Sequence, residues 1–144
     1  MTLLRSTRLL AAALLAACAA IVQAGDLVVI VSARSQVEAL RPEQVAAIFL
    51  AQSPRFPNGG LASALDHPLG SPERDQFYLR VAGKTPALLK AHWSKMVFTG
   101  RGQPPRELAG SAAVRRAVAD DPALIGYIER EALDPSVRPV LLLH

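Results

Sequence analysis

The sequence predicts a single α/β domain, a layered sheet with flanking helices. The β-branched run Leu27–Val31 is typical of a strand buried on both faces of a parallel sheet. Proline-marked helix starts follow it, and strand-like runs return at 125–128 and 137–142. Strands that alternate with helices favour this layered class.

The first 24 residues predict a secretory signal peptide. Arg5 and Arg8 precede an uncharged apolar run that extends from Leu9 to Val22, and Ala24 ends a stretch suited to signal peptidase. The run is shorter than the roughly 20 residues that a membrane span needs. We therefore expect cleavage after Ala24, a periplasmic location, and one domain over 25–144.

An alternative for this segment is a lipid anchor. Leu15-Ala16-Ala17-Cys18 resembles a lipoprotein cleavage box, in which Cys18 would be acylated. Cys18 is the only cysteine of the chain, so neither reading leaves a disulfide or a thiol for residues 25–144.

The charge balance excludes one class of partner. Two of the 16 Lys and Arg residues and none of the 12 acids lie in the first 24 residues, which leaves a net charge of about +2. Nucleic-acid-binding domains usually cluster their basic residues. Here these residues are scattered, so we expect no nucleic-acid partner.

The first half of the domain begins with a polar crossing after the first strand. Pro42 then begins a helix whose apolar stripe includes Val45 and Phe49. A loop over 53–60, rich in Pro and Gly, leads to a short predicted strand at 61–65.

Three more helices are predicted from their caps. Ser71-Pro72 begins one that ends at Gly83, and Thr85-Pro86 begins the next, which stops near Gly100. A loop over 101–106 follows, and Ser111 is expected to cap a helix ended by Asp121-Pro122. The helix that begins at Thr85-Pro86 is predicted to bury one face, which its apolar spacing defines: Leu88, Leu89, His92, Trp93, Met96 and Val97.

Three segments resemble, in order and spacing, the phosphate-specific substrate-binding proteins of ABC transporters. They are Leu40–Leu50, where Ala51 replaces a family glycine, Gly70-Ser71 before a helix, and Ala123–Ile128. The resemblance implies a fold like one lobe of a type II periplasmic binding protein. It is most similar to the short, single-lobe relatives.

The resemblance also implies a function. It points to an exported protein that binds phosphate or another small oxyanion, with ABC transporter membrane components as partners and with no cofactor. A single lobe cannot clamp an anion by hinge closure. Affinity would come from a partner lobe or a homodimer, or the chain is a ligand-free interaction or structural module of the same fold.

The first candidate site is the helix start at Gly70 and Ser71. Unpaired N–H groups and the helix dipole attract anions there. By resemblance Ser71 keeps the family's role, whereas Pro72 removes an N–H donor and Glu73 adds a negative charge. Arg74 could offset that charge. Because Glu73 places a like charge beside the anion, we expect weak binding. The plain alternative is an ordinary capped helix.

The second candidate site is the loop with Ser32 and Arg34, which follows the first strand. In open α/β sheets ligands bind outside the carboxyl ends of strands. The plain alternative for this loop is a solvated crossover.

Enzymatic and metal sites are not predicted. Asp66, His67 and Ser71 lie too close in sequence to reach triad geometry readily, and no Gly-x-Ser-x-Gly motif is present. His67, His92 and His144 lack zinc-site spacing. We expect no catalytic residue and no metal ligand.

Overall fold

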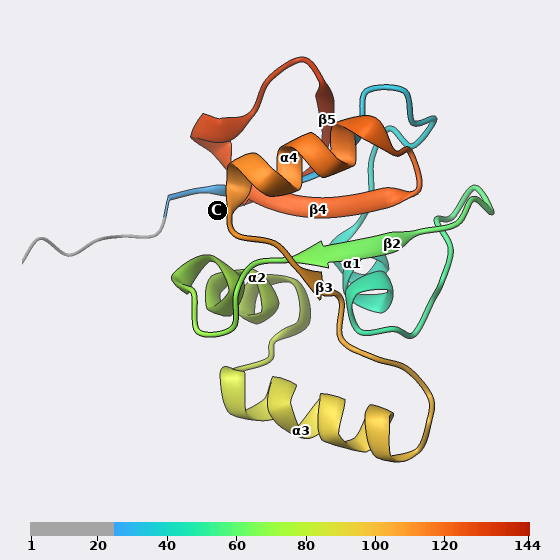
Figure 1. Ribbon diagram of the computed structural model, residues 1–144, viewed down its shortest axis with the longest axis vertical. Helices are drawn as coiled ribbons and strands as arrows, with labels where there is room; N and C mark the ends of the chain where they lie inside the picture. Colours follow the sequence, from blue (N-terminus) through green and yellow to red (C-terminus); the bar gives the residue numbers. More distant parts are fainter. Residues whose placement is uncertain (1–24) are drawn as a thin grey trace, which may run out of the picture.

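The computed structural model describes residues 25–144, so the predicted signal peptide and Cys18 lie outside the described part. A five-stranded sheet in the order β3-β2-β4-β1-β5 is flanked by helices on both faces (Figure 1). The elements are β1 (Leu27–Ser32), α1 (Pro42–Phe49), β2 (Ser63–Asp66), α2 (Pro72–Ala82), α3 (Pro86–Phe98), β3 (Arg106–Glu107), α4 (Ser111–Asp120), β4 (Leu124–Glu129), the 3-10 turn η1 (Arg130–Ala132) and β5 (Val137–Leu143). The predicted α/β class is confirmed.

β1 lies in the interior of the sheet, but its pairing corrects the prediction of a parallel strand. It runs antiparallel to both neighbours, β4 and β5. The predicted burial of β1 on both faces is confirmed, because helices cover both sides of the sheet. β2 is parallel to β3 and β4, so the sheet is mixed.

The core is divided by the sheet into two layers. Alternate residues of β1 face opposite sides: Val29 joins the cluster under α1, α2 and α3, and Val28 joins the cluster under α4. α4 therefore covers one face alone. Figure 1 shows α3 beyond α1 and α2, farthest from the sheet.

The helix starts agree with the predicted caps in two of three cases. The hydroxyls of Ser71 and Thr85 accept first-turn N–H groups, and Gly83 ends α2 in the left-handed conformation with φ 62°. Ser111 is a correction. It is the first residue of α4 rather than its cap, because its hydroxyl accepts the N–H of Glu129 on β4.

Two other details differ from the sequence expectations. The second strand starts at Ser63 rather than Leu61, which is exposed, and the loop over 101–106 ends in the two-residue edge strand β3. α3 buries a narrower stripe than predicted: Leu89 and Trp93 are buried, whereas Leu88 and Val97 are more than half exposed.

Within the described part of the chain, every helix is too short or too polar to cross a bilayer.

Candidate functional site

The candidate site lies where β2, β3 and β4 end, because parallel strands place their carboxyl ends at one edge of the sheet. After β2 the chain turns through Gly70, whose φ of 84° favours glycine, and enters α2. Ser71 caps α2, and its Oγ accepts a hydrogen bond from the Arg74 backbone nitrogen at 3.4 Å.

The N-termini of α2 and α4 open into one small pocket of about 210 Å³. α4 reaches it because it follows β3, which ends at the same edge as β2. The pocket is lined by His67, Pro68, Ser71, Glu73, Ala109, Gly110, Ser111 and Glu129.

The pocket offers hydrogen-bond donors of two kinds. The first-turn N–H groups of both helices have no carbonyl one turn before them, although Pro72 contributes none. Ser71 and Ser111 each accept a backbone N–H through Oγ, so the hydroxyl proton of each is available to a ligand. Two helix dipoles therefore favour negative charge in the pocket.

Two carboxyl groups oppose that preference. Glu73 projects from the first turn of α2 and Glu129 ends β4. The hydrogen bond to the Glu73 carboxyl raises the pKa of Glu129, and partial burial and the negative charges of Glu73 and Glu131 raise it further, while His67 lowers it. Like charges share this pocket.

The buried side chain of Asp66 joins the elements that surround the site. Asp66 accepts hydrogen bonds from the hydroxyls of Tyr78, at 2.7 Å, and Tyr127. Burial raises the pKa of Asp66, and the hydrogen bonds from both tyrosines and the charge of Arg74 oppose that rise. Burial, together with the Asp66 charge, also raises the pKa values of both tyrosines. The network links β2, α2 and β4.

His67 is only 2% exposed and its ring is held in one orientation. It stacks on Tyr127 with ring centroids 4.6 Å apart, and Nε2 lies 2.7 Å from the Tyr127 carbonyl oxygen. Because a carbonyl only accepts, Nε2 carries the proton. Nδ1 then has no hydrogen-bond partner among the described residues.

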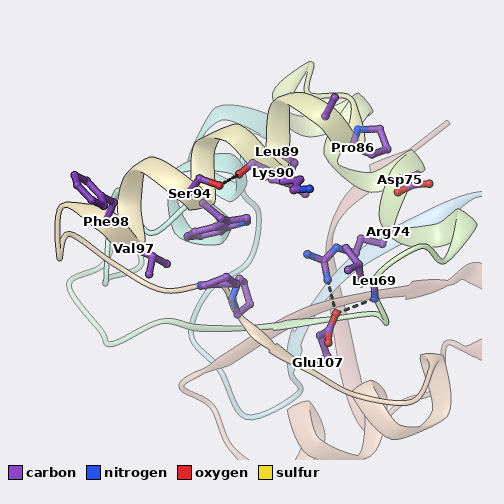
Figure 2. Close-up of a pocket in the computed structure, with 14 residues that line it drawn as sticks. Leu69, Arg74, Asp75, Pro86, Leu89, Lys90, Ser94, Val97, Phe98 and Glu107 are labelled. Carbon is purple, nitrogen blue, oxygen red and sulfur yellow. Dashed lines mark hydrogen bonds and ion pairs between the residues drawn. The ribbon is translucent and has the colours of Figure 1, made fainter.

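Arg74 lies behind the turn rather than in the pocket. It is 6% exposed, and its Nη1 lies 2.6 Å from Glu107 Oε1 and 3.8 Å from Asp66 Oδ2. Nη1 also donates to the His67 carbonyl at 3.3 Å. Figure 2 shows the guanidinium beside Glu107, which also accepts the Leu69 N–H. Arg74 therefore holds the turn in place, and two carboxylates already balance its charge.

A separate apolar groove of about 970 Å³ runs along α3 on the other side of Arg74 (Figure 2). Trp93 is 7% exposed within it, and Phe98, which is 92% exposed, lies near its end. The remaining lining residues are Leu69, Arg74, Asp75, Pro86, Ala87, Leu89, Lys90, Ser94, Val97, Pro104, Pro105 and Glu107.

The second predicted loop lies elsewhere. β1 runs antiparallel to β4, whereas β2 runs parallel to it. Ser32 at the end of β1 and Ser71 after β2 therefore lie at opposite ends of the strands. Ser32 Oγ donates to the Ala119 carbonyl at 3.1 Å, and Arg34 donates to the Asp120 carbonyl at 2.8 Å. The structure does not bring the two candidate loops together, and these two side chains satisfy the C-terminus of α4.

The side chains of Asp66, His67 and Ser71 are not connected as a catalytic triad. Asp66 bonds tyrosine hydroxyls, His67 bonds a carbonyl, and Ser71 caps α2. Within residues 25–144, the His, Asp and Glu side chains form no group of three that could hold a metal ion.

The sequence analysis named Gly70 and Ser71, of which Ser71 lines this pocket, but it did not name Ser111, Glu129 or His67 as binding candidates. These residues lie far apart in the chain and meet only through parallel pairing of β2 with β3 and β4. A two-residue strand such as β3 leaves almost no periodic signal, so the place of α4 could not be inferred.

Comparisons with known proteins identify the fold. No family model and no curated protein matches the chain. A solved structure from Clostridium perfringens, assigned as a phosphate ABC transporter substrate-binding protein with bound phosphate, aligns with a TM-score of 0.65 and 20% identity over 83% of this chain and 46% of that one.

Two further solved structures agree. An ABC-type phosphate transport receptor from Vibrio cholerae aligns with a TM-score of 0.62 and 15% identity, over 79% of this chain and 44% of that one. PstS from Borrelia burgdorferi aligns with a TM-score of 0.57 and 13% identity, over 81% and 46%. The chain spans less than half of each of these proteins, and it has the fold of one lobe of the phosphate ABC transporter substrate-binding proteins.

Proposed function

We propose that the protein binds a small oxyanion, with phosphate the first candidate, in the pocket between α2 and α4. The observation that carries the proposal is the convergence of two helix N-termini and two serine hydroxyls on that pocket. The phosphate bound to a protein of similar fold supports the choice of ligand.

The proposed roles follow from position. Gly70 provides the turn, Ser71 and Ser111 donate hydrogen bonds through their hydroxyls, and first-turn N–H groups face the anion. Arg74 acts from behind the turn, by its bond to the His67 carbonyl, which helps to hold the turn in place. Ser32 and Arg34 are the alternative site, to be invoked if changes at the pocket leave anion binding unaltered.

Binding is expected to be weak. Glu73 and Glu129 place negative charge beside the anion, and Coulomb repulsion grows where water is excluded. We expect a dissociation constant of about 0.1–1 mM or weaker, which corresponds to roughly −4 to −5.5 kcal/mol.

Calorimetric titration with phosphate, sulfate and acetate tests the proposal. Glu73→Thr removes one opposing charge and should tighten oxyanion binding several-fold. Glu43→Thr is the matched control, since Glu43 occupies the first turn of α1, away from the pocket, and should change nothing. Equal affinities for wild type and Glu73→Thr would move the site to Ser32 and Arg34. Absence of binding by both would refute the proposal.

The cellular setting is part of the same proposal. The charged and apolar start of the chain supports export to the periplasm, with Cys18 lipidation as the alternative. The solved structures of similar fold are named as ABC transporter proteins, which supports transporter membrane components as partners. We propose a non-catalytic role, with a partner lobe or a homodimer completing the anion site.

A ligand-free interaction module is the second candidate. The apolar groove along α3 favours it, because exposed apolar surface of this kind marks interaction sites. Failure of every oxyanion at millimolar concentration would favour this candidate.

A further inference from the structure

The pocket between α2 and α4 contains its own proton-binding groups. Glu73 reaches it from α2 and Glu129 from β4, so two carboxyl groups line one small pocket. No Lys or Arg is among the residues that line it. An anion that enters therefore finds two negative side chains and no cation within the lining to balance them.

His67 supplies a second observation that points to a ligand. The ring is buried, it lines the pocket, and only Nε2 is bonded. Nδ1 is an acceptor while the ring is neutral and becomes a donor when the ring is protonated. The pocket therefore contains three groups that accept hydrogen bonds, namely Nδ1 of His67 and the two carboxylates. Each of these groups becomes a hydrogen-bond donor when it binds a proton.

We propose that an oxyanion enters this pocket together with a proton, which the Glu73–Glu129 pair holds, so that affinity falls as the pH rises. The inference rests on the proposed anion site and describes its regulation. A shared proton removes one negative charge and leaves a carboxyl–carboxylate hydrogen bond, which relieves the repulsion felt by the anion.

The direction of the pH effect follows from linkage. If the anion binds the protonated pocket better, then the anion in turn makes the pocket hold its proton more tightly. The charged groups that face Glu129 are Glu73 on α2, Glu131 on the 3-10 turn and His67 after β2, while α4 contributes only Gly110 and Ser111. The raised pKa of Glu129, caused chiefly by Glu73, agrees with this direction.

Sulfate is the probe that isolates the proton of the protein, because its charge is constant across the relevant range. Titrations between about pH 8 and pH 5 should show affinity rising up to tenfold per pH unit while one proton is taken up. Repeating the titrations in buffers of different ionisation enthalpy counts that proton directly.

Two variants assign the proton. Glu129→Gln should bind sulfate more tightly than wild type at about pH 8, and its affinity should lose the pH slope. His67→Gln, which keeps a donor toward the Tyr127 carbonyl, should retain the slope. A slope lost in His67→Gln but kept in Glu129→Gln would overturn the assignment to the glutamate pair.

The two proposals fail in different ways. Wild-type protein that binds sulfate with no pH slope and no proton uptake overturns proton coupling and leaves the anion site standing. Absence of sulfate binding by wild type and Glu129→Gln at every pH overturns the anion site and the coupling together. The proton count on wild type decides the question even if a variant does not fold.

Discussion

Asp66 shows how one buried carboxylate organises the site. It lies at the end of β2 with no exposed surface, and hydroxyls from α2 and β4 both donate to it. Burial raises the pKa of the Asp66 carboxyl group above its usual value of 3.8. The folded protein therefore binds a proton at Asp66 more tightly than the unfolded chain does. The Asp66 contribution to stability is therefore complete below about pH 3.8 and is lost as the pH rises through the folded-state pKa.

The test at this position compares wild type with Asp66→Asn, which cannot ionise. Denaturant unfolding from about pH 3.5 to pH 7 should show wild type losing stability relative to the variant as the pH rises. A relative gain by wild type would mean that the tyrosine hydrogen bonds and Arg74 outweigh burial.

Single residues at helix ends were the most predictable feature of the chain. Ser71 and Gly83 carry local signals, since a cap and a left-handed glycine act within one turn. The partners of Asp66 were not predictable. Tyr127 lies 61 positions away in the sequence and reaches it only because β4 pairs with β2.

At the scale of elements, α3 buries one narrow stripe against α1 and α2. Trp93 and Leu89 belong to the core cluster, whereas Leu88 is 53% exposed. Spacing alone placed Leu88 and Val97 on the same face. It could not show that α3 lies at the margin of the domain, where only the inner edge of that face is covered.

Trp93→Ala should reduce the free energy of unfolding by about 3–5 kcal/mol, because it leaves a large cavity in this stripe. Leu88→Ala on the same helix is the control, with an expected change within about 0.5 kcal/mol. Unchanged denaturation midpoints for both variants would place Trp93 outside the core.

β4 and α4 approach each other at Gly126. A Cβ added there would lie 2.4 Å from Val114 Cγ1, which no packing tolerates. The glycine in the segment 123–128, noted in the sequence for its family resemblance, thus has a packing role.

Gly126→Ala should destabilise the fold by about 1–3 kcal/mol through overpacking. Adding Val114→Ala removes the clashing methyl, so the double variant should be more stable than the sum of the single changes predicts, by about 1 kcal/mol. Strict additivity of the unfolding free energies would show that α4 moves away instead.

At the scale of the whole molecule, the layered α/β class was predictable but the sheet order was not. Strand and helix patterns are local, and they fixed most elements to within a few residues. The pairing of β1 with β4 and β5 joins distant segments, and a buried β-branched run gives no sign of whether its neighbours are parallel or antiparallel.

Export is the prediction that concerns the chain as a whole. We expect the secreted protein to begin at Gly25, because Ala24 ends the stretch suited to signal peptidase. Intact-mass measurement on protein from the periplasmic fraction checks this. A mass that corresponds to an acylated Cys18 would establish the lipoprotein alternative.

Of the strands in residues 25–144, β1 is synthesised first, and its two neighbours β4 and β5 are synthesised last. The run Leu27–Val31 therefore has no pairing partner until about a hundred further residues have been made, and such distant pairings fold slowly. A nascent chain of this kind exposes an aggregation-prone segment for most of its synthesis. We expect this segment to need shielding until β4 and β5 have been made, and a chain that stays unfolded for so long is also in a form suited to export before folding.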